Sequence, residues 1–152
     1  MIRTAVITDA DCIYALICDM EQTVLNKCKF DKIFTELIES ADNYFLVYED
    51  NKEIQGILHM RTEYQLHHCA KIAEVMELSV KEGARSKGIG CELFESACNK
   101  AKELNCLQIE VCCNRLRERA HKFYEKQGMQ KFHYKFSMNL WGNIHLENKL
   151  GL

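Results

Sequence analysis

An apolar run, a glycine-rich loop and an amphipathic helix follow one another between residues 71 and 104, and this succession restricts the fold most strongly. The run 71–80 is interrupted mainly by two carboxylates, Glu74 and Glu77, and predicts a strand. Arg85-x-x-Gly88-x-Gly90 follows as a loop. Apolar residues then recur at helical spacing: Leu93, Phe94, Ala97, Ala101 and Leu104. A strand that turns through such a loop into a helix indicates an α/β domain.

The remaining segments extend this pattern in both directions. We expect further strands at 2–7, 44–48, 54–60, 107–112 and 132–140. Further helices are expected after a cap at Thr8 or Asp9, over 31–39, and between Asn114 and a stop at Gly128. The order β-α-α-β-β-β-α-β-α-β predicts an α/β fold with a mixed sheet. Without proline, repeat or linker, the sequence predicts a single domain over residues 1–152.

Composition and charge limit which classes of binding partner and which cellular compartment we expect for this protein. Twenty basic and twenty-two acidic residues give a net charge of -2, so no global field attracts nucleic acid or an anionic membrane. The N-terminal sequence lacks the pattern of a signal peptide, and no apolar run approaches the ~20 residues that a membrane span needs. The nine cysteines contain no C-x-x-C pair and are interpreted as reduced thiols. We therefore expect a cytoplasmic protein without nucleic-acid or membrane partners.

The loop at residues 85–90 has the chemistry of a pyrophosphate site. Two glycines allow close approach of the backbone, the following helix presents free N–H groups, and Arg85 and Lys87 add positive charge. A glycine turn that only caps the helix is the alternative. Two other phosphate motifs are excluded: Ile89-Gly90 replaces the Lys-Ser/Thr of a P-loop, and Leu93 replaces the third glycine of a Rossmann fingerprint.

Several motifs together resemble the GNAT superfamily of acetyl-CoA-dependent N-acetyltransferases. They are the Glu77–Val80 strand end, the Arg85–Gly90 loop, Asn114, and the A-x-x-F-Y-x-x-x-G segment that begins at Ala120. Leu66-His67-His68, the Glu74/Glu77 strand and the 132–136 run resemble bacterial aminoalkylphosphonate N-acetyltransferases in particular. The resemblance implies a mixed, mostly antiparallel sheet of six to seven strands flanked by about four helices.

The resemblance also implies how acetyl-CoA, the cosubstrate, is held. The strand before the loop splays from the next strand, and pantetheine lies between them. The cofactor-binding residues carried over are Leu78, Ser79 and Val80 through their backbone, Arg85, Ser86, Lys87, Gly88, Ile89 and Gly90 around the pyrophosphate, and Asn114 on the cofactor arm. A strand amide would polarise the acetyl carbonyl.

Three residues are the candidate catalytic groups. Tyr124 matches the family's general acid, which protonates the coenzyme A sulfur; a packed core aromatic is the alternative interpretation. Glu74 and Glu77 are candidate bases for the amine, because carboxylates on an apolar strand are costly unless used or paired. Three residues apart, they point to opposite faces unless a bulge intervenes, so the choice between them stays open.

The expected reaction is acetyl transfer from acetyl-CoA to a small-molecule primary amine, such as an aminoalkylphosphonate, by direct attack in a ternary complex. A protein or peptide N-acetyltransferase and a non-catalytic acetyl-CoA sensor are the alternatives. The subfamily's link to divalent metals raises that cofactor as an option, but His67, His68 and His133 are better interpreted as surface histidines, and no metal ligand is predicted. Sheet edges or the tail 141–152 offer surfaces for a homodimer.

Overall fold

The computed structural model describes residues 1–141, and the chain forms two compact units, Met1–Val111 and Cys112–Leu152. The first unit is built on a five-stranded sheet in the order β1-β2-β3-β4-β5. Its strands are β1 (Ile2–Thr4), β2 (Asn43–Asp50), β3 (Glu53–Gln65), β4 (Ala70–Val80) and β5 (Gln108–Val111). Neighbours among the first four pair antiparallel, whereas β5 runs parallel to β4. The sheet is therefore mixed and mostly antiparallel, as expected.

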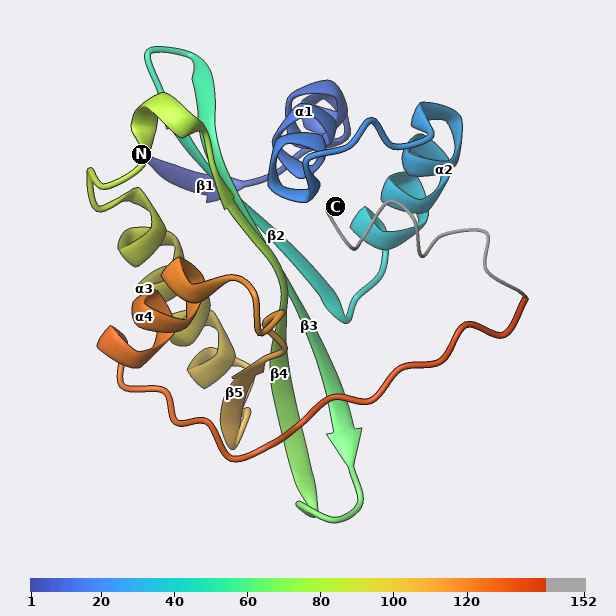
Figure 1. Ribbon diagram of the computed structural model, residues 1–152, viewed down its shortest axis with the longest axis vertical. Coiled ribbons are helices and arrows are strands. Elements are labelled where there is room, and N and C mark those ends of the chain that lie inside the picture. The colour runs from blue at the N-terminus through green and yellow to red at the C-terminus, as the bar shows by residue number, and fades with distance from the viewer. Residues whose placement is uncertain (142–152) are drawn as a thin grey trace. The chain divides into compact units, whose positions relative to one another are not determined.

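Three helices cover this sheet: α1 (Ala10–Glu21), α2 (Lys27–Ile38) and α3 (Ile89–Glu103). Figure 1 shows α1 and α2 on one side of the sheet and α3 on the other. Alternation along β3 assigns its side chains to the two faces. A Cβ on Gly56 would lie 3.1 Å from Leu93 of α3, whereas Ile57 packs in a core with Ile13 of α1 and other residues of the first two helices. From Gly56 onward, odd-numbered residues of β3 therefore face α1 and α2.

Local signals explain where these helices begin. Asn26 caps α2 by accepting a hydrogen bond from the Lys29 amide, so this helix starts earlier than the expected residue 31. Gly88 begins α3 with a φ of 87°, in the left-handed region that glycine tolerates best. In the second unit, α4 (Glu118–Lys126) ends just before Gly128, which has a φ of 85°. The predicted stop at Gly128 is confirmed.

The expected count of six to seven strands is wrong for the described chain, which has five. The difference lies in 132–140, where the structure has no regular strand. Its alternating apolar side chains are 74–93% exposed: Phe132, Tyr134, Phe136, Met138 and Leu140. Alternation specifies an apolar face, but a strand also needs a partner edge, which sequence alternation does not supply.

The remaining expectations concern membrane spans, the C-terminal tail and the number of domains. None of the helices within residues 1–141 combines the length and the apolar character that a bilayer span requires. Residues 142–152, which include most of the tail considered for a homodimer, lie outside the described part. The single domain over 1–152 stays a prediction.

Candidate active site

A β-bulge at Met76 brings the two candidate bases to one face of the sheet. Glu77 lies opposite His59 and Glu74 lies opposite Arg61, while Val75 pairs with Met60, so Met76 is the extra residue in β4. Because His59 and Arg61 are two residues apart on β3, their partners Glu77 and Glu74 share the face that carries α1 and α2. The bulge therefore removes the expected separation of the two carboxylates.

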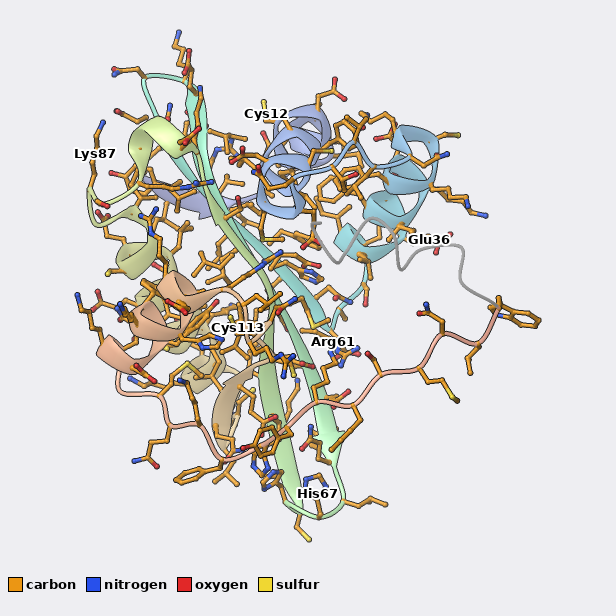
Figure 2. The ribbon with its side chains drawn as sticks, viewed as in Figure 1. Cys12, Glu36, Arg61, His67, Lys87 and Cys113 are labelled. Atoms are coloured by element: carbon orange, nitrogen blue, oxygen red, sulfur yellow. The ribbon has the colours of Figure 1, made fainter. Side chains whose placement is uncertain are left out.

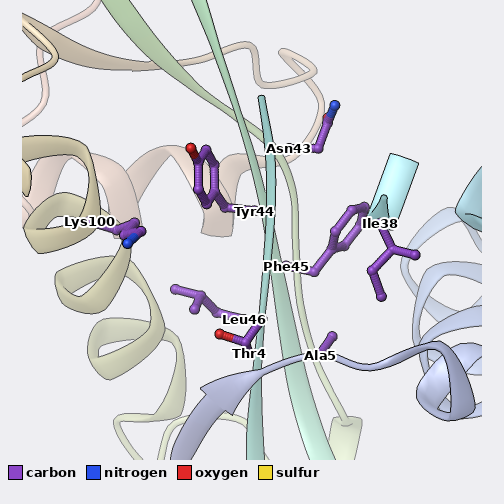
Figure 3. A pocket seen from close by; sticks show the side chains of 8 residues that line it. All are labelled: Thr4, Ala5, Ile38, Asn43, Tyr44, Phe45, Leu46 and Lys100. Atoms are coloured by element: carbon purple, nitrogen blue, oxygen red, sulfur yellow. The ribbon is translucent and has the colours of Figure 1, made fainter. Parts of the chain in front are cut away.

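The Glu77 carboxylate is paired with a buried histidine. Its Oε2 lies 2.6 Å from Nδ1 of His59, and Nε2 of the same ring lies 2.8 Å from Oδ1 of Asn43. The imidazole stacks on Phe45, with ring centroids 4.1 Å apart. In Figure 3, Asn43 and Phe45 point from β2 towards the side where Ile38 of α2 lies. The contacts join three neighbouring strands at one point.

Glu74 has a different partner. Its carboxylate accepts a hydrogen bond of 3.0 Å from Nη2 of Arg61, and the same nitrogen lies 3.3 Å from Glu63. Glu74 therefore forms a direct ion pair with a permanently charged guanidinium, whereas Glu77 contacts the imidazole of a buried histidine. The two carboxylates lie on one face in unlike electrostatic surroundings.

Beyond the bulge, one edge of β4 is open. Parallel pairing with β5 ends at Val75, opposite Val111, so β4 from Met76 to Val80 keeps only β3 as a strand neighbour within residues 1–141. The pairing stops there because β5 itself ends at Val111, and the expected divergence of β4 from the next strand stays a prediction. The side chain of Ser79 faces inward and donates to the Leu16 carbonyl at 3.0 Å. Backbone groups of 78–80, rather than their side chains, are thus the groups at this edge that a ligand can use.

The glycine-rich loop connects this edge to α3. Ser86 and Gly88 both have positive φ, 63° and 87°, which turns the chain sharply before the helix begins at Ile89. Successive amides in such a turn, together with a helix N-terminus, favour an anion. Lys87 is exposed beside them and extends away from the sheet in Figure 2. The expected pyrophosphate residues are thus brought together in one turn.

Arg85 is engaged with the protein itself. Its Nε donates to the Val80 carbonyl at 2.9 Å, and its Nη2 forms an ion pair of 2.7 Å with Asp19 of α1. Arg85 thus connects the loop to the end of β4, through Val80, and to α1, through Asp19. Arg85 therefore braces the loop, a role that the sequence pattern did not indicate.

The second unit contains the other two predicted site residues. Oδ1 of Asn114 accepts from the Leu116 amide, and its carbonyl accepts from His121. Burial raises the pKa of Tyr124 to about 12; proximity to Cys113 adds to the rise, and Arg117 opposes it. A phenol with a raised pKa holds its proton at neutral pH, as a general acid must. Tyr124 and Asn114 thus lie in a different unit from Glu74 and Glu77.

The described histidines do not form a site for a divalent metal. Within the described part of the chain, no three His, Cys, Asp or Glu side chains form a group that could hold one. His67 and His68 lie at the β3–β4 turn, where Figure 2 labels His67, with ring centroids 4.3 Å apart and ring planes tilted by 43°. Nε2 of His68 lies 3.8 Å from Glu110. Within residues 1–141, these two histidines form at most one weak ion pair.

His59, Asn43 and Arg61 were not identified from the sequence. The available signal was a histidine inside the apolar run Gly56-Ile-Leu-His-Met60, since a buried polar side chain needs a partner. That partner lies 18 positions away on β4. The sequence alone does not give the register that joins the two residues.

Comparison with known proteins gives two sequence matches. The model of the acetyltransferase (GNAT) family matches residues 10–129. A relative named aminoalkylphosphonate N-acetyltransferase, from Salmonella typhimurium, is 31% identical, with 91% of this chain and 90% of the relative covered.

Solved structures give the same fold at lower identity. A transcriptional regulator from Bacillus halodurans matches with a TM-score of 0.84 and 24% identity, covering 91% of this chain and 98% of that one. Glucosamine-6-phosphate N-acetyltransferase from Arabidopsis thaliana matches with a TM-score of 0.78 and 23% identity, covering 92% and 97%.

Proposed function

The chain belongs to the GNAT acetyltransferase family, and from this premise we propose that its acceptor is the primary amine of a small molecule. The protein is an N-acetyltransferase, and acetyl-CoA is the family's cosubstrate. The relative from Salmonella typhimurium, named for aminoalkylphosphonates, supports the same acceptor class here. Aminoalkylphosphonates are accordingly the first candidates.

The proposed reaction is supported mainly by the surroundings of the Glu77 carboxylate. Its carboxylate lies on β4 at the bulge, immediately before the open edge, and one of its oxygens is held by His59. Glu74, in contrast, is paired with Arg61. We assign the general base to Glu77, because Glu77 lies next to the open edge, whereas Glu74 lies opposite Glu110 in the part of β4 that pairs with β5 and is engaged by Arg61.

Acetyl-CoA supplies the activated acetyl group. The backbone of Leu78, Ser79 and Val80 would bind the pantetheine arm along the open edge of β4. The turn at 86–90 and the positive end of α3 would bind the pyrophosphate, with Lys87 adding charge and Arg85 bracing the turn. Asn114 would hydrogen-bond the cofactor arm.

Two side chains of the protein then accept and donate the protons of the reaction. Glu77 takes one proton from the substrate ammonium, which leaves a neutral amine with a free lone pair. As that nitrogen bonds to the acetyl carbon, the carbon–sulfur bond breaks and its electron pair stays on sulfur. Tyr124 gives its phenolic proton to that sulfur. The acetylated nitrogen releases its second proton, which restores the phenol of Tyr124, and the proton on Glu77 returns to solvent.

Release of the coenzyme A thiol tests this function. The panel contains aminomethylphosphonate, 2-aminoethylphosphonate, other small amines and a peptide with a free N-terminus. A reaction without amine corrects for the protein's nine cysteines. We expect turnover with a small amine, and about a 10²- to 10⁴-fold loss of kcat in Glu77→Gln.

Glu36→Gln is the matched control, because it makes the same change at an exposed position of α2, labelled in Figure 2. It is expected to retain full activity. Turnover confined to the peptide would refute the small-molecule acceptor, and full activity of Glu77→Gln would refute the assigned base.

A further inference from the structure

We propose that His59, anchored by Asn43, is a positioning residue that fixes the Glu77 carboxylate for proton transfer. The inference rests on the proposed role of Glu77 as general base. It adds a function for two residues on β3 and β2 that lie outside the family motifs present in this sequence. Its support is the set of contacts around one imidazole ring.

Each ring nitrogen of His59 has a polar partner, and the ring itself stacks on the ring of Phe45. Nδ1 lies 2.6 Å from Glu77 and Nε2 lies 2.8 Å from Asn43. The plane of the ring is within 8° of that of Phe45. The residue is only 5% exposed. Rotation of the imidazole would break both polar contacts and the stacking, so its orientation is determined.

Asn43 is itself fixed by the turn that follows α2. Its amide Nδ2 donates to Oγ of Ser40 at 3.1 Å, and its backbone N–H donates to the Ser40 carbonyl at 3.2 Å. The amide oxygen is thereby directed at the imidazole. The chain of contacts therefore runs from Ser40 through Asn43 and His59 to Glu77.

This arrangement leaves one carboxylate oxygen for the substrate. His59 contacts Oε2 of Glu77, and no further hydrogen bond of this side chain is present among residues 1–141. The Glu77 side chain is 35% exposed, so Oε1 is open to an amine. A carboxylate held at one oxygen cannot swing away, which is how a positioning contact accelerates proton transfer.

Two substitutions separate the contacts of the ring. The amide nitrogen of His59→Asn can replace Nδ1 and still donate to Glu77. That of His59→Gln can replace Nε2 and reach Asn43, but not Glu77. Of the two, only His59→Gln should lower kcat strongly, by about 10- to 100-fold, as expected when a catalytic group is misplaced. A purely structural histidine would give equal losses in the two variants.

The experiment measures kcat and KM for the best amine in both His59 variants, in Glu77→Gln and in the double variant Glu77→Gln/His59→Gln. Acetyl-CoA binding by calorimetry and thermal melting are measured alongside. If His59 acts through Glu77, the double variant is no slower than Glu77→Gln alone, and acetyl-CoA binding is unchanged throughout. Asn43→Ala, which keeps the ring, should lower kcat several-fold and serves if a His59 variant fails to fold.

The outcomes separate the two claims. Loss in Glu77→Gln with full activity in His59→Gln and Asn43→Ala would overturn the positioning role alone. Losses that multiply in the double variant would overturn it as well. Full activity of Glu77→Gln would instead overturn the proposed base.

Discussion

Burial raises the pKa of the Tyr124 phenol to about 12, and this fixes the pH range over which it can act as an acid. An acid whose pKa rises keeps its proton to higher pH, so the phenol stays protonated through neutral and mildly alkaline solution. We therefore predict that Tyr124→Phe lowers kcat by about 10²-fold or more at pH 7 to 8. Steady-state kinetics with the best amine measure this loss.

The same residue gives a spectroscopic test. Subtracting the tyrosinate absorbance of Tyr124→Phe from that of the wild type isolates one of six tyrosines. Its titration midpoint is expected near 12 rather than at the ordinary value of 10. A midpoint of 10, in protein that circular dichroism shows to be folded, would contradict burial of this phenol.

At the level of elements, Arg85 joins the glycine-rich loop to both β4 and α1. Its guanidinium donates hydrogen bonds to the Val80 carbonyl and the Asp19 carboxylate. The side chains of Arg85 and Asp19 are both only partly exposed. We predict that Asp19→Asn, distant in sequence from the loop, raises the KM for acetyl-CoA about threefold to tenfold, since a charged hydrogen bond is replaced by a neutral one. The kcat at saturating acetyl-CoA is expected to change little.

Initial rates at varied acetyl-CoA measure the effect of Asp19→Asn. Glu36→Gln makes the equivalent change on α2, away from the loop, and should leave this KM unaltered. An unchanged KM in Asp19→Asn would show that the loop keeps its shape without the brace.

Helices and strands could be predicted from the sequence where a single local pattern of residues determines the element. The strand at 71–80, the turn at Gly88 and the helix that follows were each indicated by the sequence. The bulge at Met76 was not, because it arises from pairing between β3 and β4 rather than from the residue itself. The site of Glu77 depends on that pairing, so the contact with His59 could only be found in three dimensions.

For the whole molecule, the open question is whether the two units unfold together, as the predicted single domain over 1–152 requires. Three partly buried thiols report on them: Cys98 and Cys106 in Met1–Val111, and Cys113 in Cys112–Leu152. Burial raises the pKa of each thiol, which lowers the reactive thiolate fraction in the folded chain. Exposed Cys12 and Cys28 should therefore react first with iodoacetamide in native protein.

We predict that Cys98, Cys106 and Cys113 become reactive over the same range of urea concentration. Pulsed labelling at each concentration, followed by peptide mass spectrometry, measures each thiol separately. Cys12 and Cys28 provide the control for reagent activity, because their labelling should not depend on urea. In a cooperative transition all buried groups are exposed at once, so the three curves coincide. Labelling of Cys113 at lower urea than Cys98 and Cys106 would mean that the two units unfold independently, and that residues 1–152 are not one folding domain.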